Sequence, residues 1–293
     1  MTAPPQVGAH PRVTNTTDDD GRSDRKGPEL DEDEQQKAKE EQSLSASVTY
    51  EAVRREGEKE LARPPQALAW SGLAAGLSMG FTLVAEGLLR SHLPDAPWRP
   101  LVAKLGYSVG FLIVMLGSQH LYTENTLTPI VPLLSRKSAA MLGRVLRLWA
   151  IVLVTNLVGT IVFAWVAART TLFDADVHVA FVGVATEAMR GDFATTLLRG
   201  IFAGWLIALM VWMLPGSKGA QFAVIVVMTY LVGVGGLAHV IAGSTDAAYL
   251  VARGMATWGD YFGRFAVPTL IGNTLGGVTL VAALNHAQVV GGE

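Results

Sequence analysis

His239 is the only histidine that lies deep within a long apolar segment of this sequence, in the stretch GVGGLAHVIAGS. An ionisable group at membrane depth is by default a functional hypothesis. An imidazole titrates near neutral pH, so a modest change of environment decides whether it holds a proton. Such a group suits a relay that protonates a weak-acid anion in a narrow pore. The structural alternative is a histidine that only forms hydrogen bonds between helices.

A second polar cluster interrupts an apolar segment at GSQHLYTENTLTP, residues 117–129. Glu124 lies there between Thr123 and Asn125, and His120 precedes it by one helical turn. A carboxyl and an imidazole in such a loop can transfer protons or can face a water-filled vestibule. We favour a cytoplasmic vestibule for Glu124 and His120.

Other kinds of chemistry have little support in the sequence. The chain has no cysteine, which excludes disulfides and thiolate metal sites. It has neither a GxSxG nor an HExxH motif and no paired carboxylates within its apolar segments, so we expect no metal site, no cofactor and no enzymatic activity. A net charge of -2 without a block of Lys and Arg argues against nucleic acid as a partner.

The elements that would hold these residues are membrane spans. Half of the residues are hydrophobic and only 16% are charged, and more than half of the charged residues precede residue 64. A membrane-spanning helix needs about 20 predominantly apolar residues. Six segments meet this test: 66–89, 101–134, 148–168, 196–214, 219–244 and 265–290.

The six predicted spans contain an internal repeat. The second and fifth are interrupted by glycines and polar residues, while the third and sixth carry the similar patterns Asn156-Leu-Val-Gly and Asn273-Thr-Leu-Gly. Thr123 precedes Asn156 at nearly the spacing by which His239 precedes Asn273. Two copies of a three-span unit must have opposite orientations, so we predict an inverted repeat whose broken second and fifth helices meet near the midplane. The alternative is two structural kinks in a packed bundle.

Three regions follow from composition. Residues 1–44 are polar and charged, and we predict a disordered cytoplasmic tail. Residues 45–65 are rich in helix formers and end in two prolines, which predicts a surface helix on the cytoplasmic side, with Glu51 and Arg55 paired along it. Residues 66–293 form the predicted six-span domain. No apolar region suited to a cleavable signal precedes the first span, which we expect to direct insertion.

Several motifs resemble those of the formate/nitrite transporter family. GSQHLYTENTLTP is similar to the loop in which that family carries Leu-aromatic-Thr, and GLAHVIAGS to its Gly-x-x-His-Ser-x-Ala element. GWLIALMVWM and LIGNTLGG resemble the family's fourth and sixth spans. The likeness covers residues 66–290, and residues 47–64 resemble an uncharacterised inner-membrane subgroup. It implies an all-α, aquaporin-like protomer, a homopentamer in the bacterial inner membrane, cytoplasmic termini and one anion pore per protomer.

The resemblance also assigns residues to the pore. It places His239 at the central histidine, Thr123 at the loop threonine and Asn273 at the asparagine that contacts the histidine. The hydrophobic constrictions it implies are formed by Leu121, Tyr107 and Phe111, with Val232 opposite.

Some positions depart from the family pattern. Gly204 stands where the fourth span usually has asparagine, and Val232 where an aromatic residue is frequent. The family lysine ahead of the fourth span falls on Ala188, which leaves open whether Arg190 or Arg199 attracts anions.

The leading functional hypothesis is passive or proton-coupled passage of a small monovalent anion, such as formate, nitrite or a short carboxylate, past His239, which would hold or transfer the proton. One alternative is a channel for neutral solutes such as water or glycerol, although the paired Asn-Pro-Ala loops of aquaporins have no counterpart here. Another is a membrane scaffold that does not transport and whose charged tail binds a partner.

Overall fold

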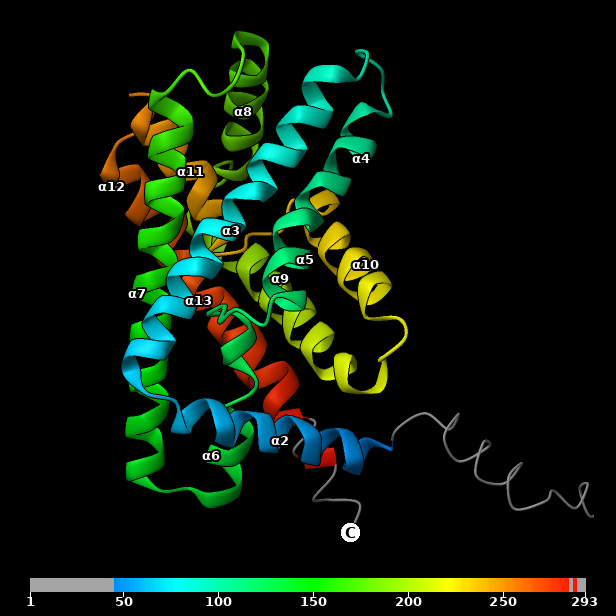
Figure 1. Cartoon of the computed structure of the whole chain (residues 1–293), viewed down its shortest axis with the longest axis vertical. Helices are drawn as coiled ribbons and strands as arrows, with labels where there is room; N and C mark the ends of the chain where they lie inside the picture. The colour runs from blue at the N-terminus through cyan, green and yellow to red at the C-terminus, as the bar shows by residue number, and fades with distance from the viewer. Residues whose placement is uncertain (1–44, 285–286, 289–293) are drawn as a thin grey trace, which may run out of the picture. The chain divides into compact units, whose positions relative to one another are not determined.

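The computed structural model describes residues 45–284 and 287–288 of the 293-residue chain. The predicted tail, residues 1–44, and part of the end of the predicted sixth span therefore lie outside the described residues. The described residues form helices and turns, with no strand (Figure 1). The helices are α2 (Ala46–Ala62), α3 (Pro65–His92), α4 (Arg99–Ala103), α5 (Tyr107–Leu116), α6 (Ile130–Arg136), α7 (Ala139–Arg169), α8 (Ala175–Ala188), α9 (Phe193–Met213), α10 (Gln221–Val234), α11 (Ala242–Ala252), α12 (Trp258–Asp260) and α13 (Val267–Leu275). Short 3-10 turns span 104–106, 124–126 and 214–216, and π-helical turns span 261–266 and 276–283.

Four helical segments of the described residues are long and apolar enough to cross a membrane. They are Pro65–His92, Arg99–Leu116, Ala139–Arg169 and Phe193–Gly216, with Gln221–Val234 as a shorter apolar helix. Large apolar side chains on these helices face outward, among them Trp70, Val154 and Phe222, which are exposed by more than half. An apolar exterior along whole helices is typical of contact with lipid.

Two close helix crossings organise the bundle. α3 packs along α7, and α9 packs along α13. At the first crossing, a Cβ on Gly76 would collide with the carbonyl oxygen of Asn156; at the second, a Cβ on Gly204 would collide with that of Asn273. Glycine is required where two backbones approach this closely. A side chain at position 204 would therefore require the backbone of α13 to shift.

The chain leaves the α-helix in two places near the centre of the bundle. One lies between α5 and α6, and the other between α10 and α11. Shortly after α5 and α10 end, Ser118 and Gly236 adopt left-handed φ values of 52° and 58°. This conformation costs little for glycine but about 1 kcal/mol or more for serine, so the turn at Ser118 depends on its surroundings.

Helix α2 lies across the ends of the elements around α6, at the opposite end of the bundle from α4 and α8 (Figure 1). Ser45 caps it by accepting a hydrogen bond from Val48 N. Glu58 pairs with Arg136 at 2.6 Å, and the predicted pairing of Glu51 with Arg55 is present at 2.7 Å. The helix is therefore fixed to α6 by specific polar contacts.

Candidate functional site

His239 lies in the segment between α10 and α11, and its side chain is almost completely buried, with 1% exposed. Its Nδ1 accepts a hydrogen bond from the backbone N–H of Ala242 at 3.1 Å. In a neutral imidazole the other nitrogen must then carry the proton. Nε2–H therefore donates to Thr123 Oγ1, 2.7 Å away in the other interrupted segment. This leaves the hydroxyl proton of Thr123 free to donate to a ligand.

Aromatic and aliphatic side chains surround this pair. The ring of Phe111 meets the imidazole edge-on with 4.9 Å between centroids, and Tyr107 packs against Phe111 at 5.4 Å. Phe111, Leu121 and Val232 are completely buried. In such apolar surroundings little water screens the His239–Thr123 pair, so the pair interacts strongly with any charge that comes near it.

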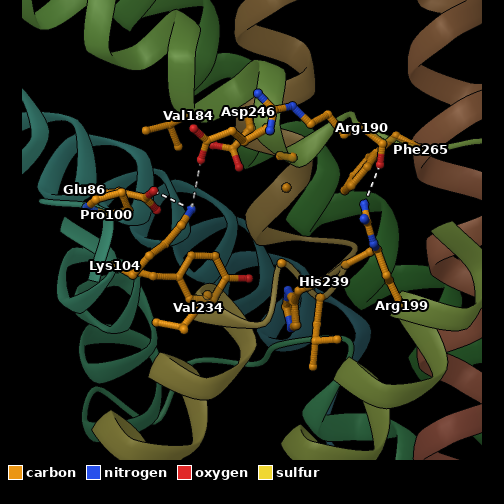
Figure 2. A pocket seen from close by; sticks show the side chains of 18 of the residues that line it. Glu86, Pro100, Lys104, Val184, Arg190, Arg199, Val234, His239, Asp246 and Phe265 are labelled. Carbon is orange, nitrogen blue, oxygen red and sulfur yellow. Dashed lines mark hydrogen bonds and ion pairs between the residues drawn. The ribbon is translucent and has the colours of Figure 1, made fainter. Parts of the chain in front are cut away.

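A cavity of about 280 Å³ lies on the α4 and α8 side of His239 (Figure 2). Tyr107 lines it near the imidazole, but Leu121, Phe111 and Val232 are not among its lining residues. The charged side chains that line it are Glu86, Lys104, Glu187, Arg190, Arg199 and Asp246. The cavity is thus a mixed-charge space that ends at the buried histidine.

Several of these charged side chains form ion pairs or hydrogen bonds with one another. Lys104 Nζ lies 2.5 Å from Glu86 and 3.9 Å from Glu187. Arg90, just outside, also pairs with Glu187 at 2.7 Å. Arg199 donates to the backbone carbonyl of Arg190 at 2.6 Å, so both arginines that the sequence left as alternatives face the cavity.

Sequence reasoning missed Glu86 and Asp246. Glu86 is 2% exposed and Asp246 is 5% exposed, although both are acidic. A usable signal was present: each is an isolated carboxyl within an apolar run, which is the criterion that singled out His239.

The two interrupted segments are held by the same set of hydrogen bonds. Asn156 Oδ1 accepts from Tyr122 N, and its Nδ2 donates to the carbonyls of His120 and Gly72. In the second segment, the amide of Asn273 makes the same three bonds: from Val240 N, and to the carbonyls of Ala238 and Gly200. Each asparagine thus braces one segment against a neighbouring long helix.

This matching corrects one detail of the predicted repeat. Spacing set Thr123 against His239, whereas the asparagine bonds make Leu121 the counterpart of His239. The shift arises because the two loops differ slightly in their separation, along the sequence, from the asparagines that brace them. The hydrogen bonds of Asn273 to this segment go to the backbone on either side of His239.

The remaining loop residues lie away from the cavity. Glu124 begins the 3-10 turn after Thr123, and Asn125 is 1% exposed. The carbonyl of Asn125 accepts from Trp149 Nε1 at 2.7 Å. Within residues 45–284 and 287–288, no group of three or more His, Asp or Glu could hold a metal ion.

Glu60 links α2 to the first interrupted segment. It is 6% exposed, and its Oε2 accepts from Thr128 Oγ1 at 2.5 Å. Burial raises the pKa of Glu60 from 4.5 to about 7, with the Thr128 hydrogen bond opposing the shift. The folded protein thus holds this proton more tightly than the unfolded chain does.

We expect the stability that depends on Glu60 to be greatest below pH 4.5 and to be lost as the pH rises through about 7. The full effect is at most about 3 kcal/mol. Glu60→Gln should remove this pH dependence, since glutamine is neutral and still accepts from Thr128. Thermal unfolding of the detergent-solubilised protein at several pH values measures this, with Glu56→Gln on the same helix as the control. Equal pH dependence in the wild type and Glu60→Gln would contradict the assignment.

Comparison with known proteins gives consistent matches. The family model described as Formate/nitrite transporter matches residues 47–287. The chain is 40% identical over 244 residues to the inner membrane protein YfdC of Escherichia coli (strain K12), which covers 83% of this chain and 79% of that protein. It is 29% identical over 213 residues to the formate channel BtFdhC of Bacillus thuringiensis, covering 71% and 80% of the two chains.

Solved structures are similar in fold. A pentameric formate channel with formate bound superposes with a TM-score of 0.64 at 18% identity, over 77% of this chain and 98% of that one. An FNT family ion channel gives a TM-score of 0.69 at 19% identity, over 81% and 97% of the two chains. At these identities the likeness establishes the arrangement of helices.

Proposed function

Because the chain belongs to the formate/nitrite transporter family, we propose that it carries a small monovalent weak-acid anion, such as formate or nitrite, across the membrane together with a proton. The observation that carries the proposal is the buried pair of His239 and Thr123 at the inner end of the mixed-charge cavity. Membership of a transporter family also argues against an enzymatic role.

The pair is suited to meet an anion. Nε2–H of His239 polarises the Thr123 hydroxyl, whose own proton is free to donate to a carboxylate or nitrite oxygen. A bare anion in an apolar slit costs several kcal/mol, and its protonated form costs much less. Transit past Phe111 and Leu121 therefore favours movement of the anion together with a proton, with His239 and Thr123 as the central hydrogen-bonding station.

We propose that the chain crosses the membrane six times as an inverted repeat. The crossings are α3, α4–α5 with α6, α7, α9, α10 with α11, and α13 with its flanking π-helical turns. The matched asparagine bonds and the paired left-handed turns at Ser118 and Gly236 support this arrangement. The two interrupted helices would meet where Thr123 contacts His239.

The similar pentameric formate channel supports a homopentamer as the assembled form. The inner-membrane relative supports a bacterial inner membrane as the location. With cytoplasmic termini, α2 lies on the cytoplasmic side and the cavity faces outward. In this orientation α2 is the surface helix of the inner face.

The direct test is flux in proteoliposomes. Purified protein is expected to accelerate the entry of formate and nitrite, with a rate that rises as the external pH falls and with proton uptake that matches the anion. Water and glycerol permeability, measured by stopped flow in the same vesicles, should stay at the level of empty liposomes. Rapid water or glycerol passage without anion flux would point to a neutral-solute channel, and no flux of any solute to a scaffold.

Val232 offers a prediction on selectivity. It is completely buried on α10 and occupies a constriction position where an aromatic residue is frequent in the family. We expect Val232→Phe to slow lactate by roughly tenfold while slowing formate less, because one lost or added contact in an apolar slot changes selectivity by 1–3 kcal/mol. Val227→Phe, an exposed position on the same helix, is the control. An equal loss for both substrates would contradict a selective constriction.

A further inference from the structure

Asp246 is the one acid lining the cavity that has no ion-pair partner among the described residues. It lies on α11 and is 5% exposed, and its Oδ1 is fully buried without a hydrogen-bond partner. Glu86 and Glu187, by contrast, are paired with Lys104 and Arg90. A buried, unpartnered carboxylate costs several kcal/mol, whereas the neutral acid costs far less. The site therefore favours a carboxyl that carries a proton.

The position of Asp246 connects it with the central pair. His239 O accepts from Gly243 N at 3.0 Å, so the chain already turns helically from His239 into α11. Gly243 and Asp246 follow on the same face, and all three residues line the cavity. Glycine places no side chain between the carboxyl and the imidazole. An anion in the cavity can therefore approach Asp246 before it reaches His239.

The hydrogen bonds of His239 imply that proton transfer to an anion requires a second titratable group. Its Nδ1 accepts from Ala242, and the proton on Nε2 is directed to Thr123. A neutral imidazole held on both nitrogens is a good hydrogen-bond donor but has no spare proton to give. A proton that travels with the anion must then come from another group along the path.

We propose that Asp246 hands a proton to the weak-acid anion in this cavity and takes one back from the neutral acid that arrives from the other side. In the forward step the O–H bond of the Asp246 carboxyl breaks and an O–H bond forms on the anion. The resulting carboxylate regains its proton from hydronium in the outer solution. This inference rests on the proposed anion transport and deepens it.

The charged and titratable groups around Asp246 come from several of the elements that line the cavity. The acids Glu86 and Glu187 disfavour a second charge, and Lys104, already paired with Glu86, moderates that effect. The remaining groups are Tyr107, Arg190, Arg199 and His239. After Asp246 loses its proton, the cationic side chains of Lys104, Arg190 and Arg199 stabilise the transient carboxylate, so the exchange can proceed in both directions.

The test compares Asp246→Asn, Asp246→Glu and Asp176→Asn in proteoliposomes loaded with a pH-sensitive dye. Asparagine keeps the size and the hydrogen-bonding capacity but cannot give up a proton. We expect Asp246→Asn to slow formate entry at least about tenfold and to flatten its dependence on external pH. Asp246→Glu should retain part of the rate and the pH dependence, and Asp176→Asn, an exposed acid on α8, should behave as the wild type.

Infrared difference spectra on the wild type provide a readout that does not depend on flux. We expect a carboxylic-acid C=O band that weakens when formate is added and that is missing in Asp246→Asn. If the wild type carries formate while Asp246→Asn shows the same rate and pH profile, or if the band is absent from the wild type, this inference is wrong and the proposed function stands. If the wild type carries no weak acid at all, the proposed function fails and this inference fails with it.

Discussion

Replacing His239 by alanine is expected to slow formate and nitrite flux by roughly 10- to 100-fold, because a hydrogen bond to a charged group is worth about 1.5–3 kcal/mol and each 1.4 kcal/mol is tenfold in rate. The alanine variant loses the donor that polarises Thr123 and the bond from Ala242. The hydroxyl of Thr123 would then have no partner holding it toward the anion. Initial rates in proteoliposomes at several pH values measure the effect.

The volume of the imidazole needs a separate control. His239→Phe keeps an aromatic ring against Phe111 but removes both nitrogens, so it should be slow as well and should not widen the path. His92→Ala changes a histidine near the end of α3 that hydrogen-bonds only to nearby residues, and should match the wild type. Wild-type rates of formate and nitrite in both His239 variants would refute the proposed central role.

The second large effect concerns the two bracing asparagines. Asn273→Ala removes three hydrogen bonds and leaves the N–H of Val240 and the carbonyl of Ala238 without partners in the protein interior, while the carbonyl of Gly200 stays within the helical ladder of α9. Each buried polar group left unsatisfied costs about 1–3 kcal/mol. We expect the unfolding midpoint in detergent to fall by about 10 °C or more, and Asn156→Ala to cause a similar fall.

Asn125 provides the matched control. Like the two bracing asparagines it is buried, but it lies within an interrupted segment, and among the described residues its side chain has only one hydrogen bond, which its Oδ1 accepts from Thr128 Oγ1 at 3.4 Å. Asn125→Ala should therefore lower the midpoint much less than either bracing variant. A comparable fall in all three would mean that burial alone, and not the three-bond brace, decides stability.

Much of the helical frame could be predicted from the sequence because lipid imposes a length and an apolar character on each crossing. The long apolar runs of α3, α7 and α9 agree with their predicted spans. The interruptions at residues 117–129 and 233–244 were visible as glycines and polar residues in apolar runs. The fold as an all-helical, channel-like protomer follows from the same signals together with the family resemblance.

The candidate site was less predictable, since its geometry depends on contacts between distant segments. Local motifs singled out His239, Thr123 and Asn273, and the structure brings these three together. The hydrogen-bond partners of Asn273 depend on which backbone atoms reach its side chain. The same is true of the match between Leu121, rather than Thr123, and His239. Spacing alone could not give that register. Glu86 and Asp246 were overlooked because neither lies in one of the two interrupting motifs to which the search for ionisable residues was limited.

The bracing of the two loops also bears on how the chain is made. Every partner of Asn156 lies between Gly72 and Tyr122, and every partner of Asn273 lies between Gly200 and Val240. Each half of the chain can therefore close its own loop without the other. Since synthesis proceeds from the N-terminus, the first loop can be set while the second is still on the ribosome. His239 would then take its position after Thr123 is already fixed in the first loop.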